Sequence, residues 1–257
     1  MNLAAIVFDF DGVFAETELD IHRVAFNRAF RDAGLLFQWD VALYGELLKV
    51  SGGKERMKAY FKQRDWTPPE DMDAYVKKLH SNKREHFEQI VLQGEVQPRP
   101  GITRLVKEAG RNAIPVGIAS TAHPDSIRTF IKHVLGEDFL ESFQFILGGD
   151  VVKRKKPDPE IYNLACEKFG VQAGRCVVIE DTENGHTAAK RAGMVTVVTP
   201  SYYSMDEDFS AADMVVSCLG VPEGPYAERI KAPESLPEFQ VVTIQLLDHL
   251  VGIAGNP

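Results

Sequence analysis

The segment Ala4-Ala5-Ile6-Val7-Phe8-Asp9-Phe10-Asp11-Gly12-Val13 sets the architecture of this 257-residue chain. Its first five residues form a short, continuous apolar run, which is typical of a strand buried on both faces of a parallel sheet. Asp9 and Asp11 follow two positions apart, and Gly12 allows the backbone to turn sharply after them. The segment therefore predicts a buried strand that brings two carboxylates to one edge of a sheet.

Later parts of the sequence repeat this pattern. Three further apolar runs predict buried strands, at residues 114–119, 176–179 and 195–198. Helical patterns alternate with them, at residues 102–110, 124–134, 158–169 and 183–192. Strands that alternate with helices favour a parallel sheet with right-handed crossovers. We therefore expect an α/β fold with a Rossmann-like, doubly wound parallel sheet as its core.

The segment from Glu18 to Leu92 interrupts this alternation. It is rich in Lys, Arg and Glu, is helical in pattern and contains no apolar strand run. The turn-prone linker Pro98-Arg99-Pro100-Gly101 follows it. We expect an inserted helical domain at residues 18–92 and an α/β core domain at residues 1–17 and 93–257. Near the C-terminus, residues 221–237 are predicted to loop over the surface and residues 239–251 to form a last helix.

Reactive side chains follow the expected strands at residues 4–8, 114–119 and 176–179, and a further expected strand that lies before Lys153. Besides Asp9 and Asp11, these are Ser120-Thr121, Lys156 and Glu180-Asp181. In open parallel sheets, ligands bind beyond the carboxyl ends of the strands, so we expect these side chains to converge there. The set offers carboxylates, a hydroxyl and an ammonium, which together suit the transfer of a negatively charged phosphoryl group.

Each residue type has a part in such a transfer. A carboxylate that attacks phosphorus needs a divalent cation and an ammonium to offset charge repulsion. Asp9 can attack, and Asp11 can protonate the leaving oxygen and later activate water. Lys156 can neutralise Asp9 and the phosphoryl oxygens, while Ser120 can donate its hydroxyl to one of those oxygens, assisted by the amide of Thr121. The predicted catalytic residues are Asp9, Asp11, Ser120 and Lys156.

Carboxylate oxygens also predict a metal site. Mg²⁺ prefers hard oxygen ligands, which Glu180 and Asp181 supply beside Asp9 and Asp11. We therefore predict Mg²⁺ as the cofactor, bound by Asp9, Asp11, Glu180 and Asp181.

These motifs resemble those of the haloacid dehalogenase superfamily of phosphatases. The string DFDGV at residues 9–13 matches its first motif, Ser120 the second, Lys156 before Pro157 the third, and Glu180-Asp181 the fourth. The resemblance implies that Asp9 forms an aspartyl-phosphate, that Asp11 acts as a general acid and base, and that a helical cap lies between the first and second motifs. Asp11 is typical of the phosphatase branch, which disfavours dehalogenation.

The insert also resembles part of this family. The string Ser51-Gly52-Gly53-Lys54-Glu55-Arg56 looks like the cap loop that sets substrate specificity. Together with the strings AETE at residues 15–18 and HRVAFN at residues 22–27, it is similar to the subgroup of CbbY-like pentulose bisphosphatases and β-phosphoglucomutases. Paired glycines let backbone approach a ligand, and two cations could hold a second phosphate. The predicted substrate-binding residues are Gly52, Gly53, Lys54, Arg56, Glu18, Ser120, Thr121 and His123.

Composition limits the possible partners. The formal net charge of −8 disfavours a broad nucleic-acid surface, which needs concentrated Lys and Arg. Neither a span of 18 apolar residues nor a signal peptide is evident, and the three cysteines form no CxxC pair. We expect free thiols, a cytoplasmic location, no membrane or nucleic-acid partner, and a monomer that binds a small phosphorylated metabolite.

The leading hypothesis is an Mg²⁺-dependent phosphomonoester hydrolase acting on a sugar phosphate or bisphosphate, for example xylulose 1,5-bisphosphate. A phosphosugar mutase would use the same core residues, so the motifs leave it open. A phosphonate hydrolase is disfavoured because Lys54 lies in a different cap context. A non-catalytic receiver-type phosphoswitch shares Asp, Mg²⁺, hydroxyl and Lys, but receivers are about half this length and lack an insert.

Overall fold

The computed structural model describes residues 1–50, 52–94 and 96–255. The chain divides into two compact units. Residues 1–16 and 97–257 form one, called here the sheet unit, and residues 17–96 form the other, called the helical unit. The sequence placed the insert at residues 18–92, and the two units are described separately below.

The sheet unit is built on seven strands in the order β3-β2-β1-β4-β5-β6-β7. The strands are β1 (Ala5–Phe8), β2 (Val116–Ala119), β3 (Phe143–Leu147), β4 (Cys176–Glu180), β5 (Val195–Val198), β6 (Met214–Val216) and β7 (Arg229–Lys231). All neighbours are parallel except β6 and β7. The predicted α/β fold with a parallel sheet is confirmed.

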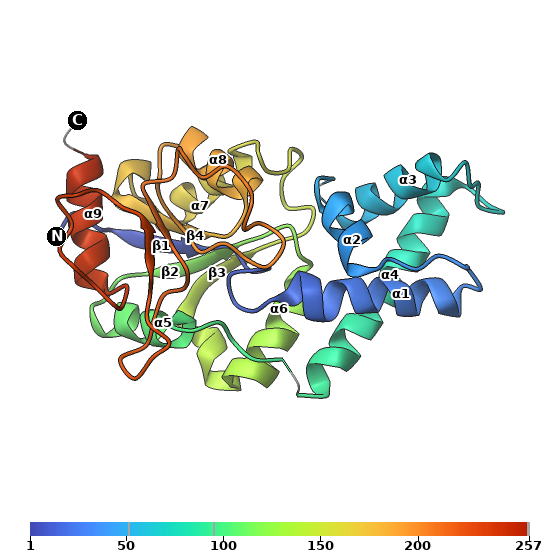
Figure 1. Ribbon diagram of the computed structural model, residues 1–257, viewed down its shortest axis with the longest axis horizontal. Helices are drawn as coiled ribbons and strands as arrows, with labels where there is room; N and C mark the ends of the chain where they lie inside the picture. The colour runs from blue at the N-terminus through green and yellow to red at the C-terminus, as the bar shows by residue number, and fades with distance from the viewer. Residues whose placement is uncertain (51, 95, 256–257) are drawn as a thin grey trace. The chain divides into compact units, whose positions relative to one another are not determined.

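Helices cover both faces of this sheet. They are α5 (Ile102–Arg111), α6 (Pro124–Phe130), α7 (Glu160–Phe169), α8 (Glu183–Arg191) and α9 (Ile244–Ala254), with short turns η2 (Ile131–Leu135), η3 (Glu137–Ser142) and η4 (Ala173–Arg175). Helices α5 and α6 lie against one face, and α7 and α8 against the other (Figure 1). Every residue of β1 is fully buried, as its unbroken apolar pattern requires.

The order of the strands places β1 inside the sheet, between β2 and β4. The chain runs from β1 outward through β2 to β3, and then returns to the other side of β1 to form β4, β5 and β6. Val7 pairs with Gly117 on β2 and with Val178 on β4. The direction of winding therefore reverses beside β1, and in doubly wound sheets this point is where ligands bind.

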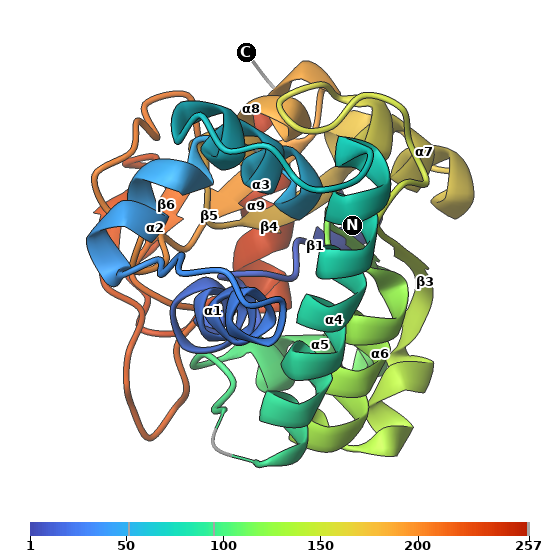
Figure 2. The same ribbon diagram turned by 90° about the vertical axis from the view of Figure 1, so that its right-hand side faces the viewer.

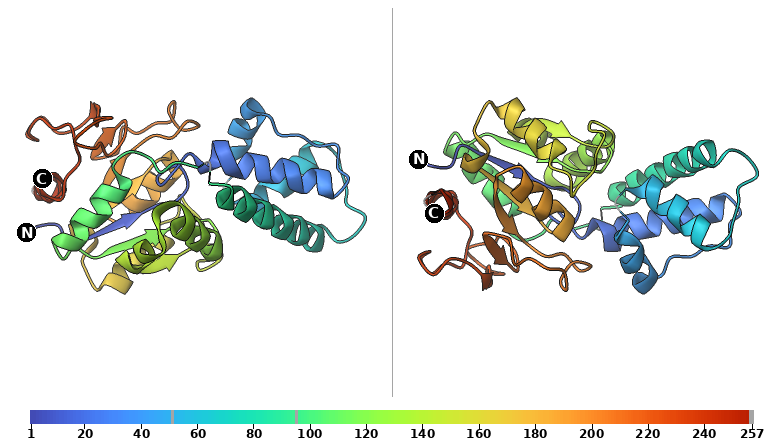
Figure 3. Two further views of the ribbon diagram at one scale, coloured as in Figure 1. Left: turned by 90° about the horizontal axis from the view of Figure 1, so that it is seen from below. Right: turned by 90° about the horizontal axis from the view of Figure 1, so that it is seen from above.

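The C-terminal segment differs from the sequence prediction in two respects. Part of the expected loop at residues 221–237 forms β7, which pairs antiparallel with β6. The last helix begins at Ile244 rather than near residue 239, because the Thr243 hydroxyl accepts a hydrogen bond from the amide of Leu246 (3.1 Å) and caps it. Asp248 on this helix also accepts a hydrogen bond from the amide of Leu3 (2.8 Å), so α9 and the first residues of the chain lie together (Figures 1 and 3).

The helical unit contains a short turn, η1 (Glu18–His22), and four helices: α1 (Arg23–Asp32), α2 (Val41–Leu48), α3 (Gly53–Gln63) and α4 (Met72–Leu92). Helices α1 and α4 lie side by side (Figures 2 and 3). Its core is a cluster of aromatic rings, in which Trp39 packs on Phe26 and Phe30 at centroid distances of 4.7 and 4.9 Å. No helix among the described residues has the length and apolar character needed to cross a bilayer.

Candidate active site

The residues that follow the central strands converge at the point where the winding reverses. Asp9 follows β1, Ser120 follows β2, and Glu180 and Asp181 lie at the end of β4. The amide of Asp9 donates to the carbonyl of Ile179 (2.9 Å), so the ladder between β1 and β4 extends into the site. Asp9, Ser120, Glu180 and Asp181 are all buried.

Lys156 links the three central strands. Its Nζ donates to Asp9 Oδ1 (2.8 Å), to the Ala119 carbonyl (3.1 Å) and to Glu180 Oε1 (2.6 Å). An ammonium has three donors, and here all three are used. The other members of the basic run, Lys153, Arg154 and Lys155, do not reach these carboxylates.

Glu180 is held by more partners than the sequence indicated. Tyr162 on α7 donates its hydroxyl to Glu180 Oε1 (2.6 Å), and the amide of Asp181 donates to Oε2 (3.0 Å). Tyr162 was not predicted as a site residue, because nothing in the local sequence distinguishes it from the other apolar residues of its helix. Lys156 donates to one carboxylate oxygen of Glu180, and the Asp181 amide donates to the other. Glu180 therefore orients the Lys156 ammonium and also adds negative charge to the site.

Asp181 differs from Glu180 in having an unsatisfied oxygen. Asp181 Oδ1 is buried and has no hydrogen-bond partner among the described residues. A buried carboxylate oxygen without a partner is costly, and such groups are commonly satisfied by an ion. Carboxylate oxygens of Asp9, Glu180 and Asp181 lie within 4.8 Å of one another. The residues therefore fit a divalent cation that prefers oxygen ligands.

The charge balance of the cluster supports the same conclusion. Three buried carboxylates lie around the Lys156 ammonium, so when all three are ionised their negative charge exceeds the positive charge that is bound directly to them. The pKa of Asp9 is raised from 3.8 to about 7, mainly by burial and also by the charge of Glu180, against the opposing effect of Lys156. Burial likewise raises the pKa of Asp181 well above its usual range, helped by the charges of Glu180 and Asp9. A divalent cation bound by these carboxylates would offset the free-energy cost of burying their negative charges together.

Glu180 and Lys156 behave as an ion pair within the cluster. Burial by itself would raise the pKa of Glu180, but Lys156 lowers it below the usual value, with the Tyr162 hydroxyl acting in the same direction. Burial would also lower the pKa of Lys156, but Asp9 and Glu180 raise it above 10.5. Lys156 is therefore charged.

The remaining predicted residues of the sheet unit lie around this cluster. Asp11 is half-buried in the turn after β1, and its charge contributes to the raised pKa of Asp9. Ser120 accepts a hydrogen bond from the amide of Ala122 (3.2 Å), which fixes its hydroxyl oxygen at the end of β2. Thr121 is half-buried beside it.

His123 has a structural contact of its own. Its Nδ1 accepts from the amide of Asp125 (3.3 Å) and caps α6, and its side chain is 42% exposed. Nothing in the contacts of His123 assigns it a ligand.

The predicted substrate-binding residues of the helical unit fall into two groups. Gly52 (φ 91°) is the N-cap of α3, Gly53 is its first residue, and Lys54 follows, half-buried. A Cβ on Gly53 would lie 2.9 Å from His80 Nε2, so this glycine allows α3 to approach α4 closely. Burial and the nearby Lys83 lower the pKa of His80 to about 3, so its imidazole is neutral.

Arg56 and Glu18 form the second group. The Arg56 side chain is 7% exposed, and it donates to the Leu47 carbonyl (3.2 Å) and the Tyr44 hydroxyl (3.0 Å). Tyr44 in turn donates to Glu18 Oε2 (2.5 Å). Arg56 and Glu18 are thus joined through Tyr44, a residue that the sequence analysis did not single out.

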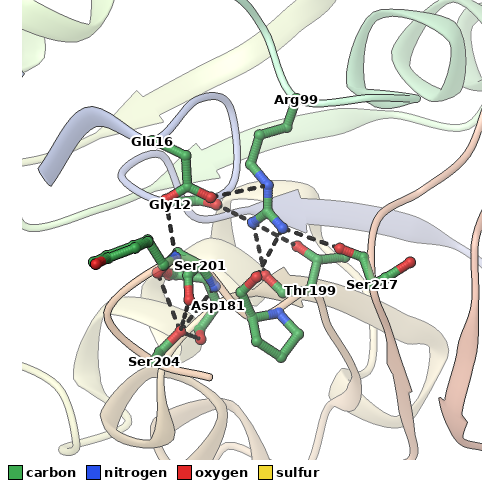
Figure 4. Close-up of polar contacts among 10 residues, drawn as sticks. Gly12, Glu16, Arg99, Asp181, Thr199, Ser201, Ser204 and Ser217 are labelled. Carbon is green, nitrogen blue, oxygen red and sulfur yellow. Dashed lines mark hydrogen bonds and ion pairs between the residues drawn. The ribbon is translucent and has the colours of Figure 1, made fainter. Parts of the chain in front are cut away.

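Sequence reasoning also missed a polar network on the other side of Asp181 (Figure 4). Arg99 had been assigned only to a stiff linker, and no role had been assigned to Ser201 or Ser204. Figure 4 shows the Arg99 guanidinium beside Gly12 and Thr199, and the two serines beside Asp181. The contacts of this network join segments about 100 residues apart in the chain, so local patterns could not indicate them.

Comparisons with known proteins agree with this geometry. Residues 3–193 match the family model for haloacid dehalogenase-like hydrolases. A CBBY-like protein of Arabidopsis thaliana is 44% identical over 224 residues, which are 85% of this chain and 70% of that protein. The protein CbbY (plasmid) of Cupriavidus necator is 39% identical over 232 residues, which are 89% of this chain and 90% of that protein.

Solved structures give the same result. A mutant of CbbY from Rhodobacter sphaeroides in complex with xylulose-(1,5)bisphosphate has a TM-score of 0.79 and 36% identity, covering 84% of this chain and 94% of that one. A β-phosphoglucomutase from Clostridium difficile has a TM-score of 0.72 at 20% identity over 98% of both chains, and it supports the fold alone. The expected enzyme class, a hydrolase of the phosphatase kind, is confirmed, and the chain belongs to the haloacid dehalogenase-like hydrolases, among the relatives of CbbY.

Proposed function

We propose that this protein is an Mg²⁺-dependent phosphatase that hydrolyses a sugar phosphate or bisphosphate through a phosphorylated aspartate. The observation that carries the proposal is the buried cluster in which Asp9, Glu180 and Asp181 face the Lys156 ammonium, while no described residue hydrogen-bonds Asp181 Oδ1. A site with this excess of negative charge cannot attract a phosphate monoester unless a cation is bound.

Asp9 is the proposed nucleophile. Its carboxylate oxygen forms a bond to phosphorus as the bond between phosphorus and the ester oxygen breaks. Asp11 gives its proton to the departing sugar oxygen. Asp11 then accepts a proton from the water that attacks the phosphorylated Asp9, and inorganic phosphate leaves as the Asp9 carboxylate is restored.

The other residues position and neutralise the phosphoryl group. Lys156 stays charged beside Asp9, and the Ser120 hydroxyl and Thr121 amide are the proposed donors to phosphoryl oxygens. Asp181, Asp9, Asp11 and Glu180 would hold Mg²⁺, which offsets the charge of the phosphoryl oxygens when bound.

The substrate class rests on relatives. The CbbY structure at 36% identity holds xylulose-(1,5)bisphosphate, and the matched region covers 84% of this chain. We propose that residues 18–92 act as a cap over the substrate and that Gly52, Gly53 and Lys54 contact its distal part. Arg56 and Glu18 would contribute by fixing the Tyr44 side chain.

Measurement of phosphate release tests the proposal. The purified protein is incubated with Mg²⁺ and a panel of sugar mono- and bisphosphates, including xylulose 1,5-bisphosphate. We expect Mg²⁺-dependent release of inorganic phosphate, and we expect Asp9→Asn to abolish it because an amide is a far weaker nucleophile. Asp138→Asn, which changes an exposed aspartate on η3, serves as the matched control and should retain activity.

Three outcomes would contradict the proposal. Full turnover by the folded Asp9→Asn variant would exclude the covalent step. Conversion of the substrate to an isomer without net phosphate release would indicate a mutase. A stable phosphorylated protein that never releases phosphate would indicate a phosphoswitch.

A further inference from the structure

Arg99 lies in the turn-prone linker that follows the helical insert in sequence, but its side chain points into the sheet unit (Figure 4). The side chain is only 12% exposed. Its own amide donates to the Phe14 carbonyl (2.8 Å), which fixes the backbone of Arg99 beside the turn after β1. A nearly buried guanidinium must satisfy its donors within the protein.

The guanidinium connects three segments that are distant in sequence. Its two terminal nitrogens donate to the backbone carbonyls of Gly12, Thr199 (2.8 Å), Pro200 (2.8 Å) and Ser217 (3.1 Å). Its Nε lies 3.7 Å from Glu16 Oε1. The two terminal nitrogens therefore donate to four backbone oxygens at the sheet edge that carries the cluster, while Nε makes an ion pair with Glu16.

Two of the segments that Arg99 holds are in contact with Asp181. A Cβ added to Gly12 would lie 1.9 Å from Asp181 Oδ2 and 3.0 Å from Ser201 Cβ, so the turn after β1 lies directly against the Asp181 carboxylate. Ser201, which follows Pro200, hydrogen-bonds the Asp181 carboxylate. Movement of either segment would therefore displace Asp181.

Ser204 and Glu16 complete the connection. The Ser204 hydroxyl donates to the Asp181 carbonyl (2.6 Å) and accepts from the amide of Ser201 (2.9 Å). Glu16 Oε2 accepts from the amide of Tyr202 (3.0 Å), while its other oxygen faces Arg99. Arg99 thus fixes the 199–202 segment both directly and through Glu16.

We propose that Arg99 is a positioning residue for the metal site: by holding the turn after β1 and the 199–202 segment together, it fixes the Asp181 carboxylate in the orientation that binds a divalent cation. This inference rests on the proposed function in one respect, namely that the cluster binds Mg²⁺. Groups that orient metal ligands typically change metal affinity by 10- to 100-fold when they are removed.

Electrostatics alone makes the opposite prediction. Arg99 carries a positive charge near Asp181 and by that charge lowers the pKa of the carboxyl. Removing the charge would make the site more negative and should tighten Mg²⁺ binding. Replacing Arg99 by Lys would keep the charge and should leave binding unchanged if charge were all that mattered. A positioning role instead predicts weaker binding in both variants, because three donors on a flexible stem cannot replace a planar set of five.

Arg104 provides a matched control. It lies on α5, five residues further along, and donates to the carbonyls of Leu219 (3.1 Å), Gly220 (3.1 Å) and Val242 (2.6 Å). Arg104 thus joins α5 to the segments around residues 219–220 and 242. None of its partners lies in the turn after β1 or in the 199–202 segment. Arg104→Met therefore removes a comparable set of backbone contacts without disturbing Asp181.

The experiment is titration of the full-length protein with MgCl₂ in a calorimeter, without substrate. Wild type, Arg99→Lys, Arg99→Met and Arg104→Met are compared after circular dichroism has established that each is folded. We expect Mg²⁺ affinity to fall about tenfold or more in both Arg99 variants and to stay at the wild-type value in Arg104→Met. Equal or tighter binding by Arg99→Met, or an equal loss in Arg104→Met, would overturn the inference.

Failure of the two proposals can be told apart. If the wild-type protein binds no Mg²⁺, the metal assignment in the proposed function is wrong. If wild type binds Mg²⁺ and the Arg99 variants bind equally well, only the positioning role is wrong. If the Arg99 variants do not fold, Glu16→Gln replaces them. This substitution removes the ion pair with the Arg99 guanidinium but keeps an acceptor for the Tyr202 amide. We expect it to lower the Mg²⁺ affinity by less than about tenfold. Wild-type affinity in that variant would contradict the inference.

Discussion

Lys156 illustrates what is decided at the scale of single residues. It is one of four consecutive basic residues, and position before Pro157 was the reason to select it. The side chain is 7% exposed, whereas that of Arg154 is 71% exposed. The Arg56 guanidinium is likewise buried, against Tyr44 and Leu47, and its contact with substrate stays a prediction. The partners of Arg56 are nine and twelve residues away, beyond the reach of the local motif.

Replacement of Lys156 by Met should destabilise the Mg²⁺-free protein. Removing one member of a buried ion pair leaves the carboxylates of Asp9 and Glu180 uncompensated, which costs about 3–5 kcal/mol of unfolding free energy. Urea denaturation measures this loss. Lys153→Met, which changes an exposed member of the same run, is the control and should stay within about 0.5 kcal/mol of wild type. Similar stabilities for the two variants would mean that Lys156 is not part of a buried ion pair.

At the scale of elements, the close approach of α8 to the end of β4 shapes the site. Thr182 caps α8 by accepting from the amide of Gly185 (3.2 Å), and this helix begins directly over Glu180. A Cβ on Gly185 would lie 1.9 Å from Glu180 Oε1. The sequence predicts both the helix and the strand, but it does not indicate that the glycine in the first turn of α8 makes room for the carboxylate.

Substitution of two helical glycines by alanine should therefore have opposite effects. Gly185→Ala is expected to lower the free energy of unfolding by about 1–3 kcal/mol, because the new methyl group overlaps Glu180. Gly110→Ala on α5 meets no atom within 4 Å and should raise it by about 0.5 kcal/mol through helix propensity. Urea denaturation of both variants provides the measurement. A stabilised Gly185→Ala would show that Glu180 does not lie beneath the first turn of α8.

At the scale of the whole molecule, the charge of the cluster links metal binding to stability. The protein carries a formal net charge of −8, and three of its carboxylates are buried together with a single ammonium. A ligand that binds only the folded state stabilises it according to its concentration relative to Kd. Binding of a divalent cation should therefore be visible as a change in global stability.

Addition of Mg²⁺ should raise the thermal midpoint. At 100 times Kd the gain is about 2.7 kcal/mol, or about 5–10 °C for a chain of this size. Asp181→Asn should abolish this shift and raise the midpoint of the Mg²⁺-free protein, because it removes one of three crowded carboxylates. Differential scanning calorimetry with and without Mg²⁺ tests both effects.

Asp213→Asn is the control for this measurement. Asp213 pairs with Lys190 (2.8 Å) and accepts from the amide of Thr196 (2.7 Å), away from the cluster. Asp213→Asn should lower the thermal midpoint of the Mg²⁺-free protein, but Mg²⁺ should still raise that midpoint by the same amount as in wild type. An undiminished Mg²⁺ shift in Asp181→Asn would place the cation elsewhere.

The amino-acid sequence by itself determined the parallel sheet and the set of reactive residues at its edge. Apolar runs bury strands, and in a parallel sheet the carboxyl ends of those strands must share one edge, so Asp9, Ser120 and Asp181 could be grouped from their positions alone. Tertiary structure decided which polar atoms are satisfied. Within the described part of the chain, Asp181 Oδ1 has no hydrogen-bond partner, and the Arg99 guanidinium donates to carbonyls about 100 residues away. Such contacts depend on the distances at which folding places remote segments, and neither periodicity nor motif spacing encodes those distances.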